Sequence, residues 1–473
     1  MPPKRSLVAH AAAIANDHSS AHVALKRLPR SRMLWTDVDA LPAGRGSAEA
    51  RKVLDACSFV VGEGGNSGWA DRYGGGGIGS NGGSGRSVVL GEYSVKGVGP
   101  TPLIGTDAPL SHSSGGAFLE EAIREAIQSR FLRGLLPHGA VPVVAIIDTG
   151  IDHVWDVNGR EVPERRVLIV RPFTLRPAHF QRAYQYRPAG YAEKRADIDR
   201  VLHNFTLFSE RYGATDLRDQ LIKCYVRWAE QIAFALVHDI ALGTSPSNVS
   251  LAGEILDFGA VSTLPYTANY FISPGVCIGQ DFAKLLRSLE DVSLSAEAFD
   301  GALYRNFHDL VERKAIAGYE NRLVAEIVAR AGVDGGRDPI DDARKNEVLD
   351  GYVRYLDQAN RLRADLLPGQ YCVDAEPVAG LDTLWTSRRP ACLDRLASTL
   401  KGFPRRHDAA GATTRSWIGT REAIREEIMQ YVANSASLSD LDAVIASFAT
   451  DRLAERSACN GGGAVPRPHQ KEG

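Results

Sequence analysis

Asn248 and Asp257 lie nine positions apart, on either side of a short apolar segment that is expected to form a hairpin. Amide and carboxylate oxygens are ligands that Mg²⁺ accepts when it binds together with nucleotide phosphates. Asp257 begins an Asp-Phe-Gly triplet, which alone is weak evidence because it also occurs by chance. It gains weight because other segments suited to a nucleotide lie upstream in order. We therefore expect the chain to bind ATP and Mg²⁺.

Glycine and serine dominate residues 62–86, and this composition is typical of a flexible linker that contributes nothing to a core. Within the tract Gly77, Gly79 and Gly82 fit the pattern G-x-G-x-x-G, and strand-like sequence follows at residues 87–95. A glycine turn between two strands can cover phosphates with backbone N–H groups. Both interpretations stay open, because so many glycines satisfy many patterns.

Lys96 ends the second strand-like segment, where a lysine can reach phosphates. A lysine taken singly more often lies in solvent on an edge strand. Residues 117–136 carry an apolar stripe that predicts an amphipathic helix. Glu121 and Glu125 lie one turn apart beside that stripe, so one carboxylate can turn inward to pair with Lys96, whereas a solvated face is the ordinary alternative.

Further along, residues 141–148 and 167–171 have the apolar pattern of buried strands. Residues 216–238 predict a long helix, and the chain is mainly helical from 281 to about 455. The fold class is therefore α+β, with an N-terminal antiparallel sheet, one helix that carries the paired glutamates, and a mainly helical second half.

The sequence divides into four parts. Residues 1–60 are alanine-rich and are expected to form a helical or irregular extension. Residues 61–180 would form the sheet with its glycine-rich loop, and residues 181–455 the helical part with the metal-binding loop. Residues 456–473 are expected to be a disordered tail.

Composition excludes several functional classes. The 473 residues are 44% hydrophobic and carry a net charge of −2, so no global basic field recruits nucleic acid or an anionic membrane. The six cysteines form no C-x-x-C pair, which argues against a zinc site or a disulfide scaffold. The start lacks the apolar stretch of a signal peptide, and no segment approaches the ~20 apolar residues of a membrane span. We expect a cytoplasmic protein.

One motif points to a different chemistry. Residues 144–152 look like the aspartate strand of subtilisin-type serine proteases, and residues 243–245 are weakly similar to their nucleophile turn. The histidines between the two segments lie in no H-G-T context, and a serine without a base is not activated. We therefore set the protease interpretation aside.

Taken together, the nucleotide-handling segments resemble the selenoprotein O (SelO) family, kinase-like proteins that transfer AMP from ATP to protein hydroxyl groups. The likeness covers about residues 60–285 and is carried by five ordered segments: residues 84–92, 94–102, 122–125, 171–176 and 237–259. It implies a protein-kinase-like fold of two lobes with ATP and Mg²⁺ between them. By the same resemblance, Lys96 and Glu125 would form an ion pair, while Asn248 and Asp257 would hold magnesium.

The resemblance also implies that Arg171 and Arg176 grip the phosphates of a nucleotide bound in inverted orientation, which exposes the α-phosphorus. Guanidinium groups suit this task because they are planar and permanently charged. The chain departs from the family where Ser247 replaces an aspartate able to take a proton, since a serine hydroxyl is a poor general base. Asp239 is a candidate substitute. Residues 110–116 replace a glycine-aspartate-glycine turn of the family.

This variant pattern, above all in residues 112–127 and 136–141, looks more like the MchC-type branch found in microcin and other modified-peptide gene clusters. That likeness implies ATP-dependent modification of a precursor peptide, with an acyltransferase as the expected partner. The acceptor would be a carboxylate, which is already ionised at neutral pH and needs no base. Such chemistry is compatible with Ser247.

The sequence therefore leads to an expected nucleotidyltransferase that moves AMP to a protein hydroxyl or a peptide carboxylate. The alternative is a catalytically silent pseudokinase that binds ATP and acts as a scaffold for a peptide-modifying partner, an interpretation that Ser247 favours. A third hypothesis is ordinary γ-phosphoryl transfer.

Overall fold

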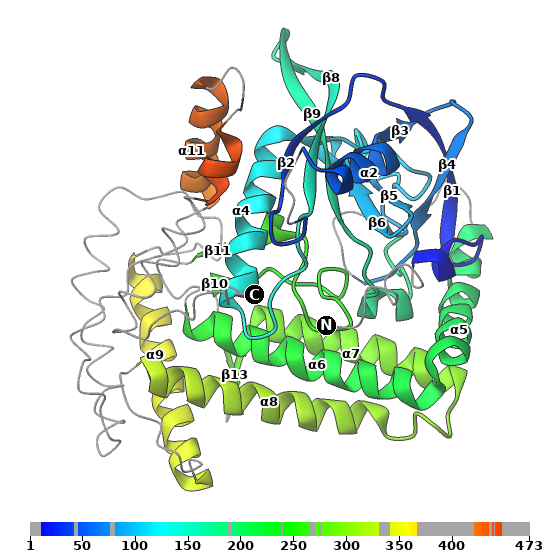
Figure 1. The fold of residues 1–473 in the computed structure, drawn as a ribbon. Helices are drawn as coiled ribbons and strands as arrows, with labels where there is room; N and C mark the ends of the chain where they lie inside the picture. The colour runs from blue at the N-terminus through cyan, green and yellow to red at the C-terminus, as the bar shows by residue number, and fades with distance from the viewer. Residues whose placement is uncertain are drawn as a thin grey trace, which may run out of the picture.

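An antiparallel sheet lies above a layer of long helices in the computed structural model of this protein (Figure 1). The α+β class, with an antiparallel sheet followed by a mainly helical half, is thereby confirmed. The structure describes residues 11–41, 46–75, 81–186, 192–238, 240–263, 270–273, 276–330, 341–366, 421–434, 438 and 440–446. The predictions for Gly77, Gly79, Asp239 and the tail at 456–473 lie outside these ranges.

The sheet has the strand order β2-β8-β9-β6-β5-β4-β1-β3, with the short β7 also paired to β9. The strands are β1 Ser20–Arg27, β2 Arg32–Thr36, β3 Phe59–Val61, β4 Asn66–Asp71, β5 Ser87–Leu90, β6 Tyr93–Lys96, β7 Ala117–Phe118, β8 Ala145–Val157 and β9 Arg160–Pro172. The expected strands at 87–95 and 167–171 are confirmed. β8 begins at Ala145 rather than Val141 and runs further than expected, into a long hairpin with β9.

Lys96 lies in an interior strand. β6 pairs with β5 on one side, where Lys96 faces Ser87, and with β9 on the other, where Lys96 faces Ile169. The alternative of a solvated lysine on an edge strand is therefore wrong. A charge at this place must find its partners inside the protein.

The extension expected at residues 1–60, helical or irregular, is wrong where this part of the chain forms strands. β1 and β2 belong to the sheet, and only α2, Ala48–Cys57, is a long helix in the described part of this region. Along β1 the side chains of Ala21, Val23 and Leu25 are buried in alternation with exposed neighbours. This period of two is a strand pattern, and the alanine-rich composition around it concealed it.

The glycine-rich tract does contribute to the core. β4 lies within the tract, and Ala70 is fully buried between β1 and β5. Beyond β4, a Cβ placed on Gly74 would lie 2.3 Å from the carbonyl oxygen of Gln181. The linker interpretation is therefore wrong at these positions. β4 is paired on both sides in the sheet, and at Gly74 the backbone packs too closely against its neighbours for a side chain.

The helices form the lower layer and the outer cover of the sheet (Figure 1). They are α3 Leu110–Ser113, α4 Leu119–Leu135, α5 Ala192–Tyr212, α6 Ala214–Val237, α7 Gln280–Phe299, α8 Phe307–Arg330, α9 Asp342–Leu366 and α11 Arg421–Asn434, with short helical turns η1 Pro177–Phe180 and η2 Phe258–Ala260. Short strand pairs join β10 Ile240–Ala241 to β11 Ser262–Thr263 and β12 Tyr270–Ser273 to β13 Val276–Gly279. The helices expected at 117–136 and 216–238 are confirmed. None of the helices in the described ranges combines the length and apolarity needed to cross a membrane.

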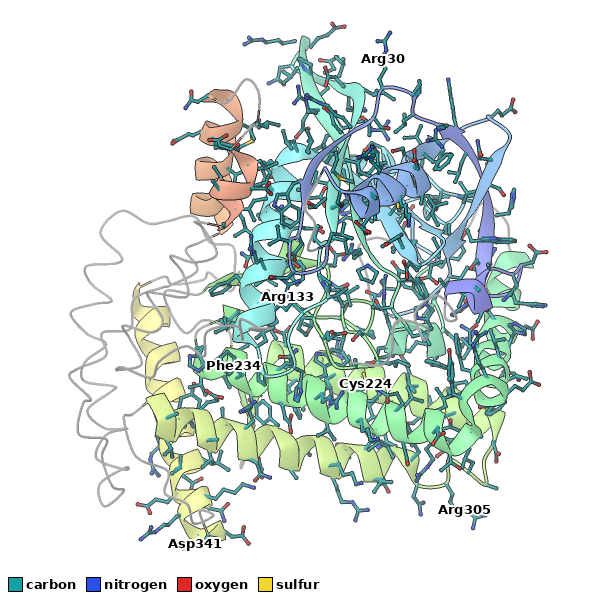
Figure 2. The ribbon with its side chains drawn as sticks, in the orientation of Figure 1. Arg30, Arg133, Cys224, Phe234, Arg305 and Asp341 are labelled. Carbon is teal, nitrogen blue, oxygen red and sulfur yellow. The ribbon has the colours of Figure 1, made fainter. Side chains whose placement is uncertain are left out.

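One large apolar core joins α4 and one face of the sheet to α6, α7 and α8, and it includes the fully buried Phe131 and Trp228. A second core lies on the opposite face of the sheet beneath α2. Side chains fill the space between the layers, as Figure 2 shows around Arg133 of α4 and Cys224 of α6. α4 therefore lies between the sheet and the layer of helices.

We expect two glycine substitutions to separate backbone strain from close packing. Gly115 and Gly91 have similar left-handed φ angles, +66° and +60°. A Cβ on Gly115 would lie 2.0 Å from the backbone of Gly99, whereas one on Gly91 would meet nothing within 4 Å. Gly91→Ala should cost about 1 kcal/mol of unfolding free energy through strain alone, and Gly115→Ala about 3 kcal/mol or more. Urea unfolding measures both, and equal losses would contradict the close approach.

Candidate functional site

Three carboxylates surround the buried ammonium group of Lys96, whose side chain is 3% exposed. Lys96 Nζ pairs with Glu125 Oε1, lies 2.8 Å from Glu121 Oε1, and lies 3.2 Å from Asp257 Oδ1. Both glutamates come from one face of α4, one turn apart. The sequence predicted one inward carboxylate, and the structure turns both toward the lysine, so the solvated alternative is wrong.

Arg86 completes this cluster, and the sequence analysis missed it. Its Nη2 lies 2.7 Å from Glu121 Oε1 and its Nη1 lies 3.1 Å from Glu121 Oε2, a bidentate pair. Nη1 also donates to the carbonyl oxygen of Gly116 at 2.9 Å. The signal was the short hairpin between β5 and β6, which places Ser87 opposite Lys96 and therefore brings the preceding arginine beside the lysine.

Asp257 reaches the cluster from the second half of the chain. Its backbone is left-handed, with φ +60°, a conformation that aspartate tolerates better than most residues. The next residue, Phe258, is 1% exposed and anchors η2 in the large core. The turn leaves the carboxylate of Asp257 beside Lys96 with 40% of the side chain exposed. It is therefore the carboxylate of the cluster most accessible to a ligand.

A short hairpin positions Asn248 relative to Asp257, as the sequence predicted. Val249 pairs with Ile255, and Leu256 N donates to the carbonyl oxygen of Asn248 at 2.9 Å. The two candidate metal ligands therefore flank the open end of one hairpin. The hydroxyl of Ser247 lies 3.2 Å from Asn248 Oδ1 and helps to orient this amide.

The segment before the hairpin is held by a residue that the sequence analysis did not single out. Asp281, at the start of α7, accepts a hydrogen bond from Thr244 N at 3.0 Å. Burial raises the pKa of this carboxyl, although Lys284 and the backbone N–H groups act in the opposite direction. The bond fixes the chain just before Ser247.

Arg171 and Arg176 are both buried, 5% and 7% exposed, and both keep unused donors. Among the described residues no acceptor lies within hydrogen-bond distance of Nε and Nη1 of Arg171 or of Nε of Arg176. Arg171 lies opposite Ser94 in the β6–β9 ladder and is close enough to lower the pKa of Asp257. Several other arginines also have a buried Nε without a partner, so Arg171, with two unused donors, is the arginine that indicates a place for an anion.

Arg176 is held in place by its own network. Its Nη1 donates to the carbonyl oxygen of Ser247 at 3.0 Å, and its guanidinium lies 4.9 Å from the centre of the Tyr73 ring. The backbone N–H of Arg176 donates to Nδ1 of the buried His179, whose Nε2 bonds to Asp71 at 2.9 Å. The network links β4, within the glycine tract, to the segment that carries Ser247.

Of the remaining candidates, Gly77, Gly79 and Asp239 lie outside the described residues. Gly82 N donates to the carbonyl oxygen of Leu103, and a Cβ on Gly82 would lie 2.8 Å from the Tyr186 ring. This close packing explains the glycine. The imidazole of His238 bonds to Glu326 of α8 at 2.9 Å, which ties it to the helical layer.

The charges of the cluster shift each other's titration. Burial raises the pKa of Glu121, but Lys96 and Arg86 outweigh it and lower that pKa to about 2. Burial likewise raises the pKa of Asp257, but Lys96, Arg171 and Arg86 together hold it well below its ordinary value. For the lysine the signs reverse, because Asp257 and the glutamates raise its pKa despite burial and Arg86. Glu121, Asp257 and Lys96 are therefore ionised at neutral pH.

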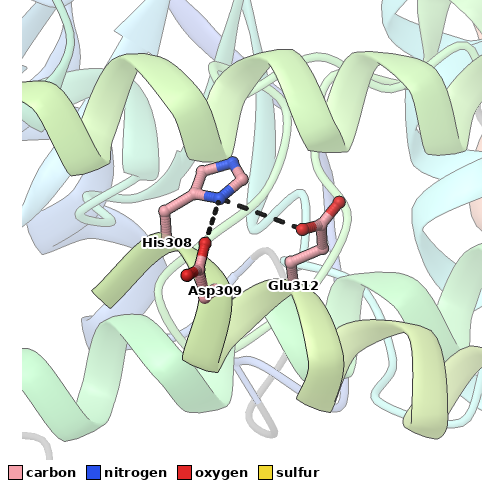
Figure 3. A group of neighbouring side chains, drawn as sticks. All are labelled: His308, Asp309 and Glu312. Atoms are coloured by element: carbon pink, nitrogen blue, oxygen red, sulfur yellow. Dashed lines mark ion pairs between the residues drawn. The ribbon is translucent and has the colours of Figure 1, made fainter. Parts of the chain in front are cut away.

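A second group of titratable side chains lies at the start of α8 (Figure 3). His308 Nδ1 lies 3.5 Å from Asp309 Oδ1 and 3.9 Å from Glu312 Oε2. The two carboxylate side chains are 75% and 37% exposed. Exposed pairs at this helical spacing are common, and nothing further points to a ligand there.

No protein-family model matches this chain, and a search of curated proteins finds no similar sequence. The cluster around Lys96 must therefore be interpreted from its own geometry.

The depressed pKa of Glu121 predicts an acid-sensitive site. Its ordinary value is 4.5 and its folded value about 2, so the stabilisation is complete above pH 4.5 and is lost as the pH falls toward 2. Glu121→Gln should lower the unfolding free energy at pH 7 by up to about 3 kcal/mol and flatten its decline below pH 5. Chemical denaturation across pH measures this. Asp55→Asn, in the exposed pair with Arg27, is the control and should change little.

Proposed function

We propose that this protein is an ATP- and Mg²⁺-dependent nucleotidyltransferase of the SelO type with a kinase-like fold of two lobes. The observation that carries the proposal is the meeting of Lys96 from the sheet with Asp257 from the helical half at 3.2 Å, close to the buried Arg171 with its two unused donors. A lysine, a carboxylate and free guanidinium donors are what a metal-bound triphosphate requires.

The residues present fit both ATP and Mg²⁺. Asp257 and Asn248 offer carboxylate and amide oxygens for Mg²⁺, and the carboxylate stays ionised because of Lys96 and Arg171, which depress its pKa despite partial burial. Arg171 and Arg176 would take phosphate oxygens with the donors that lack acceptors among the described residues. Mg²⁺ bound there would neutralise charge on the α-phosphate and on the departing pyrophosphate.

In the proposed reaction an acceptor oxygen forms a bond to the α-phosphorus of ATP. The bond from that phosphorus to the oxygen bridging to the β-phosphate breaks, and pyrophosphate leaves with the electron pair. Lys96, Arg171 and Arg176 would hold the phosphates in line for this displacement.

A peptide carboxylate is the acceptor that we favour over a protein hydroxyl. The Ser247 hydroxyl bonds to Ser245 at 2.8 Å and to the Asn248 amide, and a serine does not take a proton at neutral pH. A carboxylate acceptor is already ionised and has no proton to lose. Transfer to it would give an acyl-AMP, which an acyltransferase partner of the MchC-type pathway could pass on.

The rival proposal is a pseudokinase scaffold that binds ATP without turnover. Ser247 in place of a base supports it, because its hydroxyl bonds to Ser245 and Asn248 and is a poor general base. Ordinary γ-phosphoryl transfer is the third candidate, and the position of the label on ATP separates all three.

Incubation with α-labelled ATP and Mg²⁺ should transfer label to the acceptor and release pyrophosphate. Lys96→Met and Asp257→Asn should each reduce transfer by about 100-fold or more, since each removes a charge from the phosphate site. Arg27→Met, an exposed arginine of β1, is the control. Tight ATP binding with no labelled product would favour the scaffold, and label arriving only from γ-labelled ATP would favour phosphoryl transfer.

Substitution of Ser247 separates the acceptor classes. If the acceptor is an ionised carboxylate, Ser247→Ala should change the transfer rate by about threefold or less, because no proton passes through this residue. Ser247→Asp should then give no gain. A gain of about tenfold or more in Ser247→Asp, with a rate that rises with pH, would instead indicate a hydroxyl acceptor that needs a base.

A further inference from the structure

Arg124 connects α4 to the segment that carries Asp257. Its Nη1 donates to the carbonyl oxygen of Gly259 at 3.3 Å, and its Nε donates to Glu120 Oε1 at 3.0 Å. The arginine is buried, at 9% exposed, and Glu120 one turn earlier on the same helix balances its charge. The guanidinium therefore links α4 to the backbone of η2.

This bond acts close to a strained position. Asp257, two residues before Gly259, has a left-handed backbone that costs free energy in any residue with a side chain. Such a conformation persists only where its surroundings hold it. Phe258 holds it by burial in the core, and the Gly259 carbonyl holds it through Arg124.

Gly259 contributes to this link only through its backbone. Its φ is not in the left-handed range, and a Cβ placed on it would meet nothing within 4 Å. The carbonyl oxygen is thus the part of this residue that links η2 to α4. A substitution that keeps the carbonyl should keep the link.

We propose that Arg124 is a positioning residue that makes the placement of Asp257 depend on α4. The same helix presents Glu121 and Glu125 to Lys96, so one rigid element sets both the lysine and the metal-facing carboxylate. Arg124 acts through its bonds to Glu120 and to the Gly259 carbonyl. Its effect passes through the backbone to the carboxylate. The inference rests on the proposed function, since it concerns how Asp257 meets Mg²⁺.

The test separates metal-dependent from metal-independent nucleotide binding. Calorimetry with α,β-methylene-ATP, which cannot transfer AMP, is run in EDTA and across a series of free Mg²⁺ concentrations. Arg124→Gln should raise the Mg²⁺ concentration for half-maximal enhancement about tenfold and change affinity in EDTA by less than about twofold. Arg124→Lys keeps the buried charge but cannot make both bonds, and it should shift the Mg²⁺ requirement in the same direction.

Three further variants serve as comparisons. Glu120→Gln weakens the hold on the guanidinium and should give a smaller shift, about threefold. Gly259→Ala keeps the carbonyl and should match the wild type. Arg130→Gln makes the same change elsewhere on α4 and should also match it.

The outcomes distinguish this inference from the proposal on which it rests. If the wild type shows no Mg²⁺-dependent binding of the analogue, the proposed function is wrong. If the wild type does show it, an unchanged Mg²⁺ requirement in Arg124→Lys and Glu120→Gln would overturn the positioning role. An equal loss of affinity with and without Mg²⁺ in these variants would also overturn it, because a merely structural role predicts that result.

Discussion

The structure depends on one buried charge, the ammonium group of Lys96 in the interior of the sheet. Removing such a charge from water costs several kcal/mol unless carboxylates compensate it inside the protein. The compensation comes from two glutamates of α4 and from Asp257, which lies 161 residues further along the chain. The pairing therefore requires α4 to lie against the sheet and the hairpin at 248–257 to lie below it. The contact between the sheet and the helical layer thus depends on electrostatics as well as on apolar packing.

The charges around Lys96 balance, but not every donor is used. Arg86, Lys96 and Arg171 bring three positive charges to the region, and Glu121, Glu125 and Asp257 bring three negative ones. Arg86 is satisfied by Glu121 and by a carbonyl, whereas Arg171 keeps two donors without acceptors among the described residues. A buried guanidinium in that state is costly, and a polyanion is the simplest partner that would relieve the cost. These unused donors favour a triphosphate over a neutral ligand at the site.

Sequence reasoning located the parts whose chemistry is local. Three spacings constrain where the residues can meet: Lys96 at the end of a hairpin strand, two glutamates one helical turn apart, and an asparagine and an aspartate across a short turn. It missed Arg86 and Arg124 because their partners follow from strand register and from a carbonyl oxygen, neither of which is visible in a motif. It missed β1 and β4 because alanine- and glycine-rich composition outweighed a short alternation, and sheet neighbours supply most of what stabilises such strands.

The C-terminal third, to which the sequence assigned no role, packs against α4. α11 packs against α4, and Ile428 of α11 is fully buried in the core that includes Ile123 and Phe131 of α4 (Figure 1). Leu441, in the segment after α11, is buried in that core as well. α4 is thus fixed on one side by charges at Lys96 and on another by apolar contacts from a segment about 300 residues away in sequence. Because both sets of contacts lie on one helix, we expect a change in that distant apolar contact to alter the placement of the glutamates that pair with Lys96.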